Sequence, residues 1–571
     1  MSTYLTMSTL AILFFNFCLS AALEDASYWN SVASNELKES LSYSWNKNVA
    51  KNVILFIGDG MSVDTITASR IYRQGETGYL AWEKMPHVGM IKMILSTILS
   101  QSFPTKISCY VNVALFIFTY NTNKMVPDSA STATALFSGV KTNYKVVGVD
   151  NNVALDDCDG SLNPDFHTKS IIEWAQESGK DTGFVTTTRV THATPAPLYA
   201  HCPNRNWECE AKIPTDAKGC KDIARQLIED SPGKNIKVIM GGGRQMLKSN
   251  SSGTKIDPID TWACYSQDGR HLMEDWASDK SARKFRHQIV QNNEQLRAVD
   301  PDDVDFLLGV FANGHLNMDW QRIDTPEGQP SLEEMTIMAI RVLRKAAKGF
   351  LLVVEGGLID FAHHRGKAAQ ALRETVRFSD AVNATLEMVD LKDTLVIVTS
   401  DHSHSMAFNG YPDRNSSILG KPDIIIYKRN KWIYNFFTKV RIAQNSKYDR
   451  IPYTTLSYST GGPNNFAYEV KDNKSVRIDP SEFNTSDFNY SQQAAFIGDE
   501  AYHGGGDVPI YATGPYAHLF HSTHEQNYVA HVIGYAAQIG PYKNSSAQLG
   551  RKYIAIICSL TFIAFYCSKM L

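Results

Sequence analysis

Continuous apolar runs, each followed by a stretch with helical periodicity, restrict the fold of this 571-residue sequence more than any other feature. Runs of this kind are typical of parallel strands that helices bury on both faces. We therefore predict an α/β fold with a large, mostly parallel central sheet flanked by helices on both faces. The runs expected as strands are residues 52–57, 182–187, 237–240, 350–354, 394–399 and 508–512.

The segment from about 411 to 500 breaks this rhythm. It is rich in Asn, Ser, Tyr and Gly, and it carries several glycosylation sequons. Composition of this type favours surface loops over a buried sheet. We predict a small inserted surface subdomain here, within one large domain spanning residues 23–546.

Charge excludes one class of partner. The chain has 56 Lys and Arg against 59 Asp and Glu, which gives a formal net charge of −3. Binding to a phosphate backbone needs a basic surplus, which this chain lacks. Nucleic acid is therefore not expected as a partner.

Both ends of the chain differ from its middle. Residues 1–22 contain an apolar run and then small residues, which predicts a secretory signal peptide; a buried N-terminal helix is the alternative. Residues 547–571 end in a short apolar tail, which predicts a GPI-anchor propeptide that is removed, with a true membrane span as the alternative. The attachment residue would be Asn544, Ser545 or Ser546. We expect the mature protein at the cell surface, on the outer leaflet of the plasma membrane.

Sequons and cysteines agree with a route through the secretory pathway. Asn-X-Ser/Thr sequons begin at Asn250, Asn383, Asn415, Asn473, Asn484, Asn489 and Asn544. Disulfides are the default for cysteines in an oxidising compartment. We predict one bridge between Cys158 and Cys220 and a local bridge between Cys202 and Cys209.

Polar residues follow three of the expected strands. Asp59 comes after the first strand, Glu355 follows another, and Asp401 and His402 follow a third. Ligands of open α/β sheets bind at the carboxyl ends of the strands. These side chains are therefore expected to meet in one crevice.

A carboxylate and an imidazole recur at helical spacing in the segment 354–364. If a helix begins after its two glycines, Asp360 and His364 are four residues apart and share a face. With Asp401 and His402 they would suffice for two zinc ions that keep open positions. His503, on a glycine-rich turn, is a candidate for a further ligand, although such a histidine alone is more often a surface residue.

Small residues after Asp128 and Ser129 predict a helix that begins at Ser129. The positive end of the helix dipole favours an oxyanion there, and a neighbouring zinc would make the alkoxide accessible near neutral pH. The plain alternative is a helix cap with no catalytic role.

In this order, the motifs closely resemble those of the alkaline phosphatase family, of the animal GPI-anchored, tissue-nonspecific or intestinal kind. The resemblance runs from about Trp29 to Tyr542. The matching stretches are NVILFIGDGM (52–61), VPDSASTATA (126–135), TTTRVTHATPAPLYAH (186–201), NRNW (204–207), GGGR (241–244), VEGGLIDFAHH (354–364), TSDHSH (399–404), NGYPDR (409–414) and HGGGDV (503–508).

The resemblance implies a role for each matching residue. Ser129 would be the nucleophile of a phosphoserine intermediate, Arg205 would hold two phosphate oxygens, and Asp128 would orient Arg205. Two zinc ions and one magnesium ion are implied. The ligands of the first zinc would be Asp360, His364 and His503. Those of the second zinc would be Asp59, Asp401 and His402, and this ion would also contact Ser129. Those of magnesium would be Asp59, Thr194 and Glu355, with His192 nearby.

The implied activity is hydrolysis of small phosphate monoesters with broad specificity. The resemblance also implies an ectoenzyme that forms a homodimer, and the amphipathic stretch 26–45 is a candidate dimer arm. A phosphodiesterase or sulfatase is disfavoured by Arg205 and by the missing sulfatase motif. A catalytically impaired surface glycoprotein with the same fold is the other alternative.

Two departures from the family pattern bear on these expectations. Residues 93–118 have no counterpart, and they are either a retained intron or gene-model error or a real exposed loop. Phe361 stands where the family usually has histidine or another polar residue, so phosphate affinity and pH optimum would shift. A calcium site is not expected, because Phe311, Ala312 and the region around Gln329 lack its carboxylates.

Overall fold

The computed structural model describes residues 25–91, 121–412, 414, 416–420 and 446–543. The chain divides into two compact units, Met1–Trp45 and Asn46–Leu571. The described part of the first unit is helix α2 (Ala26–Ser42), which is capped by Asp25 and buries none of its residues. The predicted signal peptide, the 93–118 insertion and the anchor propeptide lie outside the described residues.

A ten-stranded sheet forms the centre of the second unit. Seven adjacent strands, from β8 to β5, run parallel, whereas β16 is antiparallel to both of its neighbours. The strand order is β17 (Ser522–His524), β2 (His87–Ile91), β16 (Val508–Thr513), β8 (Thr394–Thr399), β1 (Asn52–Gly58), β7 (Phe350–Gly356), β3 (Asp181–Arg189), β4 (Val238–Gly242), β6 (Phe306–Val310) and β5 (His287–Val290).

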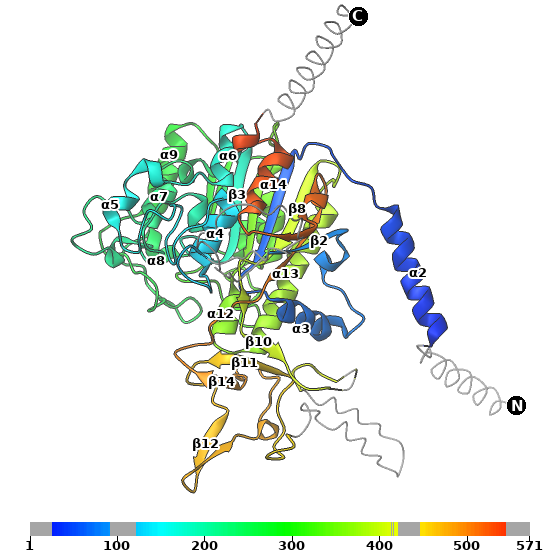
Figure 1. Ribbon diagram of the computed structural model, residues 1–571. Helices are drawn as coiled ribbons and strands as arrows, with labels where there is room; N and C mark the ends of the chain where they lie inside the picture. The colour runs from blue at the N-terminus through cyan, green and yellow to red at the C-terminus, as the bar shows by residue number, and fades with distance from the viewer. Residues whose placement is uncertain (1–24, 92–120, 413, 415, 421–445, 544–571) are drawn as a thin grey trace, which may run out of the picture. The chain divides into compact units, whose positions relative to one another are not determined.

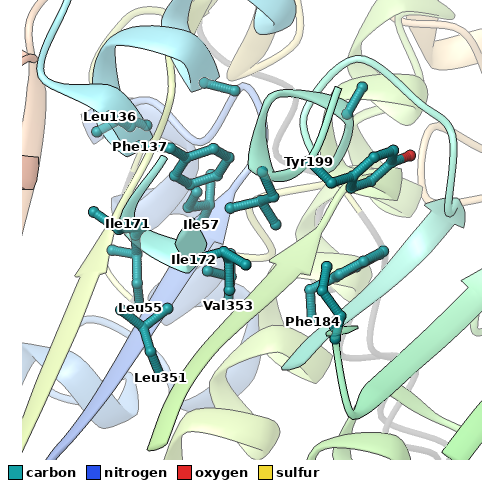
Figure 2. Packing of buried hydrophobic residues seen from close by; sticks show 14 of the residues in the cluster. Leu55, Ile57, Leu136, Phe137, Ile171, Ile172, Phe184, Tyr199, Leu351 and Val353 are labelled. Atoms are coloured by element: carbon teal, nitrogen blue, oxygen red, sulfur yellow. The ribbon is translucent and has the colours of Figure 1, made fainter. Parts of the chain in front are cut away.

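Helices cover both faces of this sheet because successive strand residues point to opposite sides. Leu55 and Ile57 of β1 belong to one apolar cluster, while Ile54 and Phe56 belong to the other. The first face packs against α4 (Ser129–Ser138), α6 (Ile171–Glu177), α7 (Ile223–Glu229), α9 (Leu272–Ala282) and α14 (Tyr528–Ala537), as Figure 2 shows for α4 and α6. The second face packs against α3 (Val63–Gln74), α11 (Leu332–Leu343) and α13 (Ala368–Met388).

The predicted α/β fold is confirmed, and each predicted strand is present with its bounds shifted by a few residues at most. One strand differs from expectation in direction: β16, predicted among parallel strands, is antiparallel to β8. Strands β2, β5, β6 and β17 were not predicted. They are short, and β5 and β17 carry polar residues because each lies at an edge of the sheet.

Part of the segment predicted as an inserted subdomain forms separate small sheets, together with one strand that precedes the segment. Strands β10 (Met406–Phe408), β11 (Leu456–Gly461) and β14 (Ala494–Ile497) make a three-stranded sheet, and β12 (Tyr468–Lys471) pairs with β13 (Lys474–Arg477). Figure 1 shows these strands together at one end of the unit, beyond α3 and α12 (Leu358–His364). Tyr458 of β11 is buried in the interface with α12.

One predicted disulfide is confirmed and the other is wrong. Cys158 is bonded to Cys220, but Cys209 is bonded to Cys264 and not to Cys202, which is a buried free thiol. The NRNW turn separates the two predicted partners: Cys202 pairs through its backbone with Val147, while Cys209 faces Cys264. Burial raises the pKa of the Cys202 thiol to about 12, which keeps it neutral.

Removal of the unpredicted bridge should destabilise the protein. In a C209S/C264S double variant we expect the free energy of unfolding to fall by about 2–4 kcal/mol. The bridge joins residues that are 55 positions apart, so it limits the conformations open to the unfolded chain. The thermal midpoint, measured by calorimetry, should fall. Cys202→Ala is the matched control, and an equal fall in that variant would contradict the assignment of the bridge.

No helix in the described parts of the chain is long and apolar enough to cross a membrane.

Candidate metal and phosphate site

Three neighbouring parallel strands bring the predicted polar residues to one edge of the sheet. In the register, Ile57 of β1 pairs with Glu355 of β7 on one side and with Thr399 of β8 on the other. Asp59 follows directly after β1, Asp401 comes two residues after the end of β8, and both are fully buried. The strand register therefore brings these residues to one edge of the sheet.

Helix α12 begins after the two glycines, as the sequence predicts, and it supplies the next pair. Asp360 Oδ2 lies 3.1 Å from His364 Nε2, four residues along the helix. Gly60 makes room for this pair: its φ is +66°, and a Cβ there would lie 2.8 Å from Asp360 Oδ1. Glycine adopts that conformation without strain, and its lack of a Cβ leaves the space free.

Backbone carbonyls fix the orientation of the histidine rings. His364 Nδ1 lies 2.8 Å from the carbonyl of Ala501, and His503 Nδ1 lies 2.8 Å from that of Pro127. Each Nδ1 therefore donates a proton to its carbonyl, and each Nε2 has a lone pair when the ring is neutral. Although burial acts to lower it, the charge of Asp360 raises the pKa of His364 to about 9, so a metal ion would displace a proton from this Nε2. The two Nε2 atoms converge to 3.1 Å, and the His503 ring stacks on His402 at 3.6 Å between centroids. Lone pairs brought together in this way are the arrangement of metal ligands.

The acidic and imidazole side chains form three overlapping groups in which the potential ligand atoms lie within 4.8 Å of one another. The groups are Asp360, His364, His404 and His503; Asp59, Asp360 and His402; and Asp59, His192 and Glu355.

Several of these buried atoms have no hydrogen-bond partner among the described residues. They include both carboxylate oxygens of Asp59, Glu355 Oε1 and Asp360 Oδ1. Buried polar atoms are normally satisfied, so orphaned oxygens here point to cations. The two histidine-containing groups around Asp360 fit zinc, and the carboxylates of Asp59 and Glu355 fit magnesium.

Electrostatics agree with this interpretation. Burial, and then the charge of Asp401, raise the pKa of Asp59 well above its ordinary value. Burial also raises the pKa of Glu355 to about 7, against the opposing hydrogen bonds from Thr186 and Thr188. Thr194, a predicted magnesium ligand, is buried in the same region, and its hydroxyl also acts to lower the pKa of Glu355.

Ser129 is the first residue of α4, and Asp128 caps that helix by accepting a hydrogen bond from the amide of Ala130 at 3.2 Å. Ser129 Oγ lies 3.2 Å from His402 Nε2 in a buried environment. The serine hydroxyl therefore lies beside both the helix N-terminus and His402, a predicted zinc ligand.

Asp128 also holds Arg205. A guanidinium nitrogen of Arg205 donates to Asp128 Oδ2 at 3.1 Å, and the other lies 3.3 Å from His192 Nε2. Although burial acts to raise it, the charge of Arg205 helps to hold the pKa of Asp128 below its usual range. The guanidinium is thus fixed in orientation beside the ligand groups.

Other residues near the site were not predicted. His404, two residues after His402, has its Nε2 3.4 Å from Asp360 Oδ1, and the spacing in DHSH was a signal for it. His363 hydrogen-bonds Tyr458 at 2.8 Å and Thr65 at 3.0 Å, so it ties α12 to the small sheet and to α3. No sequence signal joins His363 to a tyrosine 95 residues away.

A parallel α/β sheet that gathers a buried serine, a fixed arginine and convergent imidazole and carboxylate ligands at its carboxyl edge defines a metal-dependent phosphohydrolase. Residues 50–539 match the family model described as alkaline phosphatase. The chain belongs to the alkaline phosphatase family, and it is a phosphate-monoester hydrolase.

Relatives match along nearly the whole chain. The tissue-nonspecific alkaline phosphatase of Gallus gallus is 39% identical, covering 92% of each chain, and that of Homo sapiens is 37% identical, covering 94% of each. Alkaline phosphatase 4 of Drosophila melanogaster is 35% identical, covering 91% of this chain and 83% of its own. In fold, the alkaline phosphatase of Thermus thermophilus matches with a TM-score of 0.56 and 22% identity, over 86% of this chain and 92% of its own.

Proposed function

We propose that this phosphatase acts on a broad range of small phosphate monoesters through a phosphoserine at Ser129, with two zinc ions and one magnesium ion. Asp360, His364 and His503 would hold the first zinc. Asp59, Asp401 and His402 would hold the second. Asp59, Thr194 and Glu355 would hold magnesium. A variant of the phosphatase from the Antarctic bacterium TAB5, a protein of similar fold, has been solved with magnesium bound in its M3 site.

The convergence of the His364 and His503 Nε2 atoms is the observation that carries this proposal. Carbonyl groups orient both rings, so the lone pairs face one space beside the Asp360 carboxylate. An ordinary Asp–His pair on a helix, or a helix cap with no catalytic role, would not require the two rings to be oriented in this way. The alternative of a catalytically impaired glycoprotein is not favoured, since the family model and the relatives that match nearly the whole chain are those of alkaline phosphatases.

In the proposed reaction, the Ser129 hydroxyl loses its proton to solvent, Oγ attacks phosphorus, and the bond from phosphorus to the leaving oxygen breaks. The alcohol departs after it gains a proton from solvent. Water then cleaves the phosphoserine, releases phosphate and restores the hydroxyl. Arg205 would hold two equatorial oxygens throughout, in a position that Asp128 fixes. When bound, the metal ions supply positive charge that lowers the pKa of hydroxyl groups and offsets the charge that develops on the oxygens.

Hydrolysis of p-nitrophenyl phosphate across pH 7–10, with zinc and magnesium supplied, tests the proposal. We expect turnover by the wild-type protein and a loss of roughly a hundredfold in kcat/KM for Arg205→Ala, the size of effect found when one transition-state donor is removed. Arg205→Lys should recover only part of it, because lysine lacks the bidentate fork. Full activity in Arg205→Ala would contradict the role given to this guanidinium.

We further propose that the mature protein is a homodimer held at the outer leaflet of the plasma membrane by a GPI anchor. Support for the anchor comes from the apolar tail in 547–571 and the small residues before it. Support for the dimer comes from α2, which leaves Trp29, Leu37 and Leu41 exposed.

A further inference from the structure

Helix α12 presents two adjacent faces. Asp360 and His364 occupy the face that belongs to the candidate metal groups. Phe361 and Arg365 are also four residues apart, and each follows one of those ligands, so they lie about 100° further round the helix. The Arg365 guanidinium stacks over the Phe361 ring, 3.9 Å from its centroid. This second face therefore flanks the metal-binding face.

A row of rings connects this face to Arg205. Arg205 contacts His192 at 3.3 Å, and the His192 ring packs edge-on against His315 with 5.0 Å between centroids. The His315 ring in turn lies 5.0 Å from Phe361. The row begins at the guanidinium proposed to hold phosphate and ends at the guanidinium of Arg365.

The arginines around this row differ in how their charges are balanced. Arg205 is paired with Asp128, and the buried Arg189 is paired with Glu208 at 2.8 Å and Asp260 at 3.2 Å. Arg365 is exposed and stacks on Phe361, and within the described part of the chain no hydrogen bond or ion pair is formed by its guanidinium; the charge of Asp260, which is itself paired with Arg189, acts on it from a greater distance. Its positive charge is therefore available to a molecule from solution.

The leaving group of an in-line displacement departs on the side opposite the nucleophile. Ser129 adjoins His402, so the leaving oxygen is expected beside the other histidine-rich group, which contains Asp360 and His364. Arg365 is the next residue after His364. The alcohol portion of a substrate should then extend toward the Phe361–Arg365 pair.

We propose that Arg365, stacked on Phe361, is a specificity-determining residue that favours phosphate monoesters whose leaving group carries a second negative charge. This inference rests on the proposed function. An aromatic leaving group would add contact with the Phe361 ring, but the charge preference requires only the guanidinium. The expected size is modest, because a partly solvated charge pair contributes little.

The test compares three aryl phosphates that differ in charge at the para position: 4-carboxyphenyl phosphate, phenyl phosphate and 4-(aminomethyl)phenyl phosphate. The selectivity is the ratio of kcat/KM for the carboxylate substrate to kcat/KM for the ammonium substrate. We expect this ratio to be about three- to tenfold higher in the wild type than in Arg365→Ala, mainly through KM. Arg365→Glu should reverse the preference, and added salt should shrink it. Phenyl phosphate should change less than twofold.

Arg341→Glu is the matched control. Arg341 is exposed in the last turn of α11. This helix ends at Leu343, which lies beside Gly183 near the amino end of β3. The variant therefore makes the same charge change as Arg365→Glu, but at the opposite edge of the sheet. An equal change for all three substrates in Arg365→Ala, or a selectivity shift of the same size in Arg341→Glu, would overturn the proposal.

A second measurement separates this inference from the proposed function. Binding of 4-carboxybenzylphosphonate and of benzylphosphonate is compared by calorimetry, which needs no turnover. If no aryl phosphate is hydrolysed, the proposed reaction fails, while the charge preference is still decided by these two affinities. Equal affinities in wild type and Arg365→Glu would overturn the role of Arg365.

Discussion

Replacement of Ser129 by alanine is expected to reduce turnover of p-nitrophenyl phosphate by roughly a thousandfold or more, since removal of a nucleophile abolishes the covalent route. Metal content should stay unchanged, because the imidazole and carboxylate ligands remain. Wild-type protein mixed with substrate and quenched in acid should carry phosphate on Ser129, detected by peptide mass spectrometry, and the variant should carry none.

Ser138→Ala is the control for this change. Ser138 lies in the same helix, is also buried, and bonds only to neighbouring backbone groups among the contacts described for it. Its variant should keep most of the activity. A Ser129→Ala protein with a tenth or more of wild-type activity would show that another group attacks phosphorus.

Removal of the metal ions is expected to lower activity roughly a hundredfold or more, and to lower the thermal midpoint as well. A site that holds its ion at a thousandfold excess over Kd contributes about 4 kcal/mol to stability. Dialysis against a chelator, followed by calorimetry and assay, measures both losses. Zinc and magnesium added back together should restore them, and unchanged activity after complete removal would contradict a metal-dependent reaction.

The stability lost on metal removal should depend on pH. Burial raises the pKa of Glu355 to about 7 and that of Asp401 to about 6, so the folded metal-free protein binds these protons more tightly than the unfolded chain does. The contribution of these two carboxyl groups to the stability of the metal-free protein should therefore be lost as pH rises from about 4.5 through 7, whereas burial lowers the pKa of His402 to about 4 and that of His503 to about 3, which acts in the opposite direction. The gap between metal-loaded and metal-free midpoints should be larger at pH 8 than at pH 5.5, and equal gaps would contradict this account.

Much of the fold could be predicted because buried parallel strands leave an unmistakable apolar pattern. The pattern does not record the direction of a strand, and β16 is apolar enough to be taken for one of its parallel neighbours. Edge strands are half exposed, so β5 and β17 lack the continuous apolar run on which the prediction depends.

The candidate site could be predicted to the extent that its residues lie in motifs at the ends of strands. Asp360 and His364 follow from helical spacing, and Ser129 follows from the capping pattern. The Cys209–Cys264 bridge and the bond from His363 to Tyr458 could not be predicted, because each joins segments whose approach is set by the packing of the whole unit. His315 was missed for the same reason.

The order in which the proposed ligands are made has a consequence for biosynthesis. Asp360 and His364 lie in α12, whereas His503 lies in β15 (His503–Gly504), near the end of the domain. A ribosome must make most of the chain before His503 can join the other two, so the ion proposed for this group cannot be captured by a nascent fragment in native geometry. Selection of that ion then takes place on the nearly finished fold, from the ions present in the compartment that receives it.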